Sequence, residues 1–127
     1  MKQFSLLALF SILGVSLRWV IVTLIPFQFA MISGVLIVNV IGSFLIGILI
    51  QITANSEIIS PEMKTALVVG FLGSLTTYSS FASEIFRFLN ERMILSGVLY
   101  FINHSLITLV SLFIGYYLSA FFFSRLF

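Results

Sequence analysis

Long stretches without a charged side chain limit what this chain can fold into more than any other feature. No charge lies between Lys2 and Arg18, from Trp19 to Ser56, or within residues 93–124. A helix that spans a bilayer needs about 20 predominantly apolar residues, so these stretches locate candidate spans. Only 8% of the 127 residues are charged and 61% are hydrophobic, whereas a soluble domain carries roughly 25% charged residues. These proportions exclude a cytosolic enzyme and indicate an integral membrane protein.

Turn signals and charges divide the chain into four spans within one membrane domain, residues 1–127. Pro26 marks the end of the first span, and a polar loop at Glu57 follows the second. Ser60-Pro61-Glu62 is typical of a helix start, and Asn90-Glu91-Arg92 closes the third span. The expected spans cover about residues 4–25, 30–51, 62–89 and 94–123. We therefore expect an all-α protein with four transmembrane helices.

The positive charges are almost equally divided between the two sides of these spans. Lys2, Lys64 and Arg125 fall on one side; Arg87 and Arg92 fall on the other, with Arg18 if its side chain extends that way. Insertion follows the Lys/Arg bias, so this balance gives almost no direction. Either such small counts carry no meaning, or the chain inserts both ways and pairs as antiparallel protomers.

One face of the second span carries small and polar residues at Asn39, Ser43 and Gly47. Small residues let helices approach closely, and Ser can hydrogen-bond across the contact, so packing explains Ser43 and Gly47. Packing explains Asn39 less well, because a carboxamide brings two donors and an acceptor that must be satisfied in lipid. We interpret Asn39 as functional.

The fourth span carries a similar face. It comprises His104, Thr108, Ser111, Gly115 and Ser119 at spacings of three or four. We interpret Ser111, Gly115 and Ser119 as packing residues. Ionisable residues inside a membrane are usually functional, yet His104 and Thr108 can either line a polar path or bond to a neighbouring helix, and both interpretations stay open.

Two further charged side chains need a partner. Arg18, at the end of the first span, either extends to the membrane surface or bonds to a loop carbonyl or to Glu84. Glu84 is the one acid well inside an expected span, and Arg87 offers it a local ion pair three residues later.

The centre of the third span is rich in residues that weaken a helix. Residues 70–84 hold two glycines and six Ser or Thr residues. Glycine lowers helix stability, and hydroxyls offer the backbone other partners, so we expect a break near residues 73–78, with a kinked packing helix as the alternative. Non-helical backbone at membrane depth persists only inside protein or beside a polar cavity, and broken helices can hold ions there.

These segments resemble signatures of the Fluc/CrcB fluoride channel family. Gly70-Phe71-Leu72-Gly73-Ser74-Leu75-Thr76-Thr77-Tyr78-Ser79-Ser80-Phe81 resembles G-F-x-G-x-x-T-T-F-S-T-F. Val38-Asn39-Val40-Ile41-Gly42-Ser43-Phe44-Leu45-Ile46-Gly47 resembles V-N-x-x-G-S-F-L-x-G, and Gly14 through Arg18 resembles G-x-x-x-R. The likeness extends to the chain length and the four-helix layout.

The resemblance implies a passive, fluoride-selective channel in the cell membrane that exports cytoplasmic fluoride. It implies an antiparallel dimer of identical or paralogous subunits, with the third helix broken in mid-membrane. Backbone carbonyls at Gly73 and Thr76 would bind a central, non-permeating Na⁺. The implied ion pathway comprises Asn39, Tyr78, Ser79, Ser80, Phe81, Glu84, His104 and Thr108, with Arg18 in a structural role. Tyr78 departs from the family's Phe; it keeps the ring quadrupole and adds a hydroxyl.

Two other functions compete with this one. A small dual-topology exporter of the multidrug-resistance type needs a carboxylate in the first span, and residues 4–25 contain none. A non-transporting assembly subunit predicts packing motifs but does not explain the polar cluster at residues 76–81. The expected partners are fluoride, the lipid bilayer and a second subunit, with no nucleic acid. We expect no enzymatic activity, because His104 and Glu84 lie on different helices and the sequence shows no nucleophile elbow, metal triad or phosphate loop.

Overall fold

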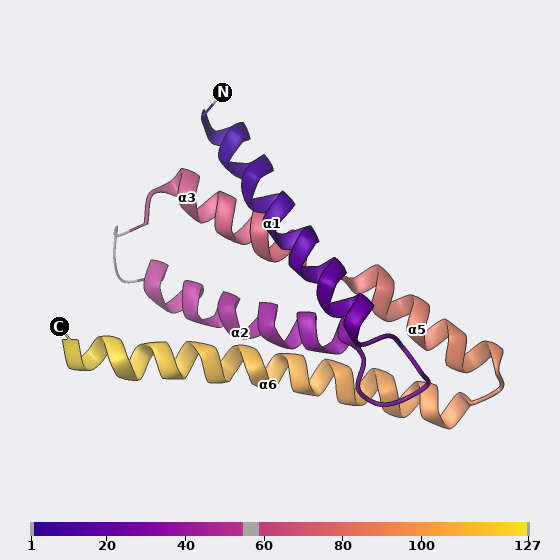
Figure 1. The fold of residues 1–127 in the computed structure, drawn as a ribbon. Helices are drawn as coiled ribbons and strands as arrows, with labels where there is room; N and C mark the ends of the chain where they lie inside the picture. Colours follow the sequence, from indigo (N-terminus) through magenta and orange to yellow (C-terminus); the bar gives the residue numbers. More distant parts are fainter. Residues whose placement is uncertain (1, 55–58, 127) are drawn as a thin grey trace.

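The computed structural model describes residues 2–54 and 59–126, with the backbone alone for residues 123–126. Glu57 and the side chain of Arg125 lie outside the described residues. The elements, in order, are α1 (Lys2–Leu24), α2 (Gly34–Ala54), α3 (Pro61–Thr65), the π-helix η1 (Ala66–Leu72), α4 (Gly73–Leu75), α5 (Tyr78–Asn90) and α6 (Ile94–Leu126) (Figure 1). The described part of the chain contains four stretches long and apolar enough to cross a bilayer: Lys2–Leu24, Gly34–Ala54, Pro61–Asn90 and Ile94–Phe122. The four-helix prediction is therefore confirmed.

Helices α2 and α6 lie side by side along most of their lengths (Figure 1). A Cβ atom at Gly47 would collide with the backbone of Leu112, and one at Gly115 would collide with the backbone of Phe44. The Ser111 hydroxyl donates to the Val40 carbonyl oxygen across the same contact, at 2.9 Å. The packing interpretation of Gly47, Gly115 and Ser111 is therefore confirmed.

Helix α1 crosses the first half of the third span in the same close manner. A Cβ atom at Gly14 would collide with the Phe71 carbonyl oxygen, and one at Gly70 would lie 3.0 Å from the Leu7 carbonyl oxygen. The remaining surface of α1 is open, since Gly14 is the one buried residue of this helix. Large apolar side chains such as Trp19 and Leu24 are exposed there, as a surface in contact with lipid requires.

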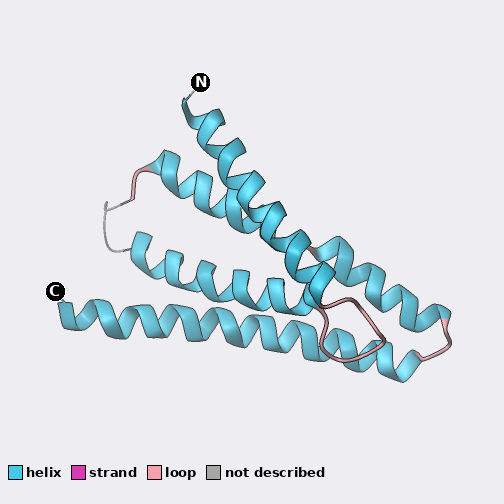
Figure 2. Ribbon diagram, viewed as in Figure 1, coloured by secondary structure: helices cyan, strands magenta, loops and turns pink. Residues whose placement is uncertain are grey.

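Helix α2 begins at Gly34, later than the expected start near residue 30. Pro26 cannot continue a helix, and Phe29 has a positive φ of 55°, so residues 25–33 form an irregular connection (Figure 2). The Ser33 hydroxyl then accepts a hydrogen bond from the Leu36 amide at 3.2 Å. Ser33 thus caps α2 and sets where the helix starts.

The third span is divided into two halves by Thr76 and Thr77. Both residues have extended backbone, with φ −82°, ψ 155° at Thr76 and φ −152°, ψ 116° at Thr77. The π-helix η1 precedes the break, and such segments often lie at functional sites. Helix α5 follows the break and packs against the start of α6 (Figures 1 and 2). The predicted break near residues 73–78 is therefore present.

Candidate functional site

The break is held open by the side chain of Asn39 from α2. Its Oδ1 accepts a hydrogen bond from the Thr77 amide at 2.8 Å, and its Nδ2 donates to the Thr77 carbonyl oxygen at 3.2 Å. The carboxamide therefore pairs with both backbone groups of Thr77, as a neighbouring strand would. Each of these groups would cost about 1–3 kcal/mol if it were buried without a partner. Asn39 thus supplies the hydrogen-bond partners that a non-helical Thr77 needs inside the protein.

The same arrangement diverts two donors from their usual helical acceptors. In an unbroken helix the Thr77 amide would bond to the Gly73 carbonyl, and the Ser80 amide would bond to the Thr76 carbonyl. Here the Thr77 amide donates to Asn39, and the Ser80 amide donates to the Thr77 hydroxyl at 3.2 Å. The carbonyls of Gly73 and Thr76 are therefore released from the bonds that a continuous helix would give them.

Arg18 contacts one of these carbonyls. Its Nη1 lies 3.5 Å from the Thr76 carbonyl oxygen, a long hydrogen bond that joins α1 to the break. Of the alternatives raised by the sequence, the structure places Arg18 at a backbone carbonyl rather than at Glu84. The guanidinium thus brings a positive charge to the discontinuity.

His104 on α6 is the third member of the hydrogen-bonded group at the break. Its Nε2 lies 3.0 Å from Nδ2 of Asn39. The imidazole is only 4% exposed, and its ring centroid lies 4.0 Å from that of Phe81. We call Asn39, Thr77 and His104 the break cluster.

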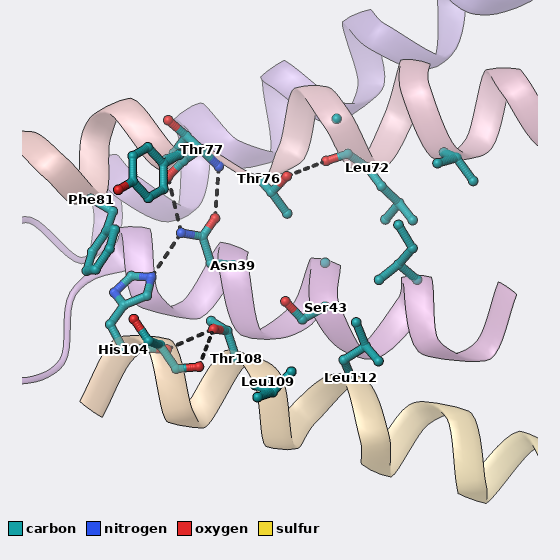
Figure 3. A pocket seen from close by; sticks show the side chains of 16 residues that line it. Asn39, Ser43, Leu72, Thr76, Thr77, Phe81, His104, Thr108, Leu109 and Leu112 are labelled. Atoms are coloured by element: carbon teal, nitrogen blue, oxygen red, sulfur yellow. Dashed lines mark hydrogen bonds between the residues drawn. The ribbon is translucent and has the colours of Figure 1, made fainter. Parts of the chain in front are cut away.

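A hollow of about 620 Å³ opens beside the break cluster, between α2, α6 and the third span (Figure 3). Among the residues that line it are seven that the resemblance places in the ion pathway or at the Na⁺ position: Asn39, Gly73, Thr76, Tyr78, Phe81, His104 and Thr108. The structure therefore gathers most of the candidate pathway and both candidate Na⁺ positions around one space. The Thr108 hydroxyl donates to the His104 carbonyl oxygen at 2.8 Å, so its hydrogen is directed along its own helix.

Three candidate pathway residues lie elsewhere. Ser79, Ser80 and Glu84 line a second hollow, of about 400 Å³, together with Arg87. The Arg87 guanidinium lies over the rings of Phe27 and Phe29, with its central carbon 4.8 and 5.4 Å from the two ring centres. We call these spaces the larger and the smaller hollow.

Glu84 is held by two hydroxyl groups that the sequence did not single out. Its Oε2 accepts hydrogen bonds from Ser33, at 3.1 Å, and from Tyr100 on α6. Ser33 and Tyr100 are 0% and 1% exposed, which makes them among the most enclosed polar side chains described. We call Ser33, Glu84 and Tyr100 the carboxylate cluster. The spacing of Tyr100, one turn before His104 on the same helix face, was a signal that could have identified it.

Sequence reasoning also missed the role of Thr77. Its hydroxyl caps α5 by accepting from the Ser80 amide, and it also contacts the hydroxyl of Ser79 at 3.2 Å. Thr is among the residues preferred at a helix N-cap, and this preference was the available signal. Thr77 therefore ends the break and starts α5.

Backbone carbonyls are the available ligands for a cation at the break. Among the described residues no group of three or more His, Cys, Asp or Glu side chains is placed to hold a metal ion. Hard cations prefer oxygen ligands, including backbone carbonyls, and the Gly73 and Thr76 carbonyls are among those released by the break. A Cβ atom at Gly73 would meet only the Val68 carbonyl oxygen, at 3.5 Å, so this part of the backbone is open to approach. The residues present fit a Na⁺ ion bound by carbonyls.

Comparison with known proteins identifies the family to which the chain belongs. Residues 5–116 match the family model described as CrcB-like protein, Camphor Resistance (CrcB). The chain is 38% identical over 99 residues to the fluoride-specific ion channel FluC of Methanococcus vannielii, covering 77% of this chain and 80% of the relative. It is 36% identical over 91 residues to the FluC protein of Methanococcus aeolicus, covering 72% and 73%. It is 38% identical over 82 residues to that of Geotalea daltonii, where the match spans 65% of this chain and 66% of the relative. The chain belongs to the CrcB family.

Proposed function

We propose that the protein is a passive, fluoride-selective channel that exports cytoplasmic fluoride across the cell membrane. The observation that carries the proposal is the larger hollow, where Asn39, His104 and the aromatic rings of Tyr78 and Phe81 meet at a helix break. The relatives named fluoride-specific ion channel support it. A channel of this kind performs no covalent chemistry, in keeping with the family.

The lining of the larger hollow suits a small, strongly hydrated anion. Selective passage requires polar groups that replace the hydration shell yet release the ion again. The lining carries no side chain with a fixed positive charge, so the hollow does not trap the anion. The rings of Tyr78 and Phe81 meet edge to face, with centroids 5.8 Å apart at 69°, and an aromatic edge carries partial positive charge.

The functional unit in this proposal is an antiparallel dimer. In the single chain Tyr78, at the rim of the larger hollow, is 76% exposed, so one protomer leaves the aromatic lining uncovered. A second, oppositely inserted protomer, identical or paralogous, would close that side. The nearly equal division of Lys and Arg between the two sides is what dual insertion requires.

A central Na⁺ completes the proposed assembly. The Gly73 and Thr76 carbonyls would hold it, and the ion would supply positive potential at the subunit interface. The same carbonyls of a second protomer would add further oxygen ligands. Arg18, which contacts the Thr76 carbonyl, keeps this backbone in place from the α1 side.

Fluoride efflux from liposomes that contain the purified chain tests the proposal. We expect rapid fluoride-dependent efflux and no efflux of chloride under the same gradient. Equal passage of both anions would contradict selectivity. Absence of fluoride flux from a folded, dimeric preparation would favour the non-transporting assembly subunit, whereas proton-coupled efflux of an organic cation would favour the exporter.

A further inference from the structure

The smaller hollow lies where two spans end on the same side of the membrane. Its walls come from the end of α1, the α1–α2 connection, the start of α2 and one face of α5. The first and third spans cross in the same direction, because one other span separates them. They therefore end at the same surface, at Leu24 and Asn90. Arg87 precedes Asn90 by less than one helical turn, so the rim of the hollow lies close to the level of the lipid headgroups.

Arg87 stands at this rim with its guanidinium group held through its faces. The central carbon lies 4.8 Å from the centre of the Phe27 ring and 5.4 Å from that of the Phe29 ring. The described partners of Glu84 are Ser33 and Tyr100 rather than Arg87. The N–H groups at the edge of the guanidinium are therefore available to an anionic oxygen from outside the chain. The planar, forked arrangement of these donors matches a phosphate group.

Hydroxyl groups follow α5 from the break toward Arg87. Ser79, Ser83 and Arg87 are spaced by four residues and so share one face of the helix, and Ser80 lines the same hollow. Ser83 lies one turn below Arg87, and both side chains are exposed. A phosphate group has several acceptor oxygens, so a guanidinium and a neighbouring hydroxyl can bind it together.

Glu84 contributes an acceptor to the inner wall of the same hollow. The hydroxyls of Ser33 and Tyr100 both bond to its Oε2, so Oε1 remains for another donor. A ligand in the hollow thus meets a positive group at the rim and a negative group one turn deeper. A simple anion is attracted by Arg87 and repelled by Glu84. A ligand that carries a phosphate and an ammonium group is attracted by both.

We propose that the smaller hollow binds the headgroup of an amine-bearing phospholipid of the phosphatidylethanolamine type. The phosphate lies against Arg87 and the Ser83 hydroxyl, and the ammonium group donates to Oε1 of Glu84. Residues three apart on a helix are about 5–6 Å apart at Cβ, a separation that the two-carbon linker between phosphate and ammonium can bridge. Pro26 and Val35 give the hollow an apolar wall for the glycerol. The site is separate from the larger hollow and does not depend on fluoride conduction.

Lipid binding to the full-length protein tests the proposal. Native mass spectrometry counts the lipids that the protein retains when phosphatidylethanolamine, phosphatidylcholine or phosphatidylglycerol with identical acyl chains is added in detergent. We expect one tightly retained phosphatidylethanolamine per subunit and about tenfold weaker retention of the other two, because each lacks a charge-assisted hydrogen bond to Glu84. The quaternary ammonium of phosphatidylcholine has no N–H group, and phosphatidylglycerol has no cation.

Substitutions at the rim identify the phosphate contact. We expect the affinity for phosphatidylethanolamine to fall about tenfold in Arg87→Gln and about threefold in Ser83→Ala. Arg87→Lys keeps a cation over the two rings but loses the planar fork, so a loss of about threefold in this variant separates phosphate binding from damage to the packing. Arg92→Gln is the matched control, because it removes one positive charge from the nearby α5–α6 turn without changing the lining of the hollow.

Equal retention of the three lipids would overturn the proposal. So would a preference for phosphatidylglycerol, or an Arg87→Gln variant that binds phosphatidylethanolamine as well as Arg92→Gln does. None of these measurements involves fluoride flux, so such a result would leave the proposed function standing. Efflux from liposomes tests that function separately.

Discussion

The break cluster and the carboxylate cluster join nearly the same elements and have opposite chemical character. Asn39, Thr77 and His104 include no carboxylate, and Nδ1 of His104 has no hydrogen-bond partner among the described residues. In the carboxylate cluster, two hydroxyls donate to a single oxygen of Glu84. The first group leaves one buried ring nitrogen without a partner among the described residues, whereas the second has its donors directed at a carboxylate.

This difference indicates which hollow suits an anion. The larger hollow is lined by the break cluster and by aromatic rings, with no acidic side chain among its residues. The smaller hollow contains Glu84, whose charged form would repel fluoride, beside Arg87. The pathway role proposed for Ser79, Ser80 and Glu84 stays a prediction, and the structure separates these three residues from the rest.

The largest expected effect is that of Asn39→Asp. The substitution removes both amide hydrogens, sets a carboxylate oxygen against the Thr77 carbonyl and places a negative charge at the larger hollow. A buried charge without a partner costs about 3–5 kcal/mol, so we expect fluoride flux to be lost and the chain to be less stable. Liposome efflux together with thermal unfolding in detergent measures both. Thr53→Ala, at a hydroxyl bonded within α2, is the control, and wild-type flux in Asn39→Asp would remove Asn39 from the pathway.

A smaller effect is expected when a methyl group is added at a glycine. The loss of stability should depend on how closely that glycine packs against a neighbouring helix. Gly115→Ala forces a methyl group into the Phe44 backbone, so we expect a loss of about 1–3 kcal/mol in the free energy of unfolding. Gly73→Ala meets only one atom, at ordinary contact distance, and Ala favours helix over Gly by about 1 kcal/mol.

Denaturant titrations of the two variants in the same detergent provide the comparison. Equal stabilities would contradict the close α2–α6 contact. If Gly73→Ala folds as expected, its free energy of unfolding can be measured with and without Na⁺. A change in this Na⁺ dependence would then report on the carbonyl at the break rather than on a loss of overall stability.

Ser33→Ala tests whether the carboxylate cluster is structural. The substitution removes the cap of α2 and one donor to Glu84, so we expect a loss of about 1–2 kcal/mol in the free energy of unfolding. Fluoride flux should stay within about threefold of wild type, because the residue does not line the larger hollow. A tenfold loss of flux in a folded Ser33→Ala channel would place the carboxylate cluster on the ion route.

The sequence predicted those features that depend on the solvent and on short-range propensity. The four spans follow from apolar length, the break from the glycine and hydroxyl content around Thr76 and Thr77, and the packing of Gly47 and Gly115 from their size. The α1–α2 connection was longer than expected because the cap at Ser33, rather than Pro26, decides where α2 begins.

Partners that lie far apart in sequence could not be predicted in this way. Asn39 was singled out because lipid does not satisfy a carboxamide, but nothing local indicated that Thr77, 38 residues later, uses both of its termini. The association of Ser33 with Tyr100 spans 67 residues. Such pairings depend on how the helices meet, and the periodicity of one helix carries no information about its neighbour.

The smallest expected effect is that of Tyr78→Phe, which tests whether the lining of the larger hollow depends on rings or on hydroxyls. Tyr78 is 76% exposed in the single chain, and its ring meets Phe81 edge to face. Phenylalanine keeps this contact and removes only the hydroxyl, so we expect the free energy of unfolding to change by less than about 0.5 kcal/mol and fluoride efflux to stay within about twofold of wild type. Tyr78→Leu, which removes the ring and its positive edge, should lower efflux further than Tyr78→Phe. If Tyr78→Phe instead raised fluoride flux tenfold, the hydroxyl itself would be the obstacle, and the aromatic pair would be acting by size rather than by the charge of its edges.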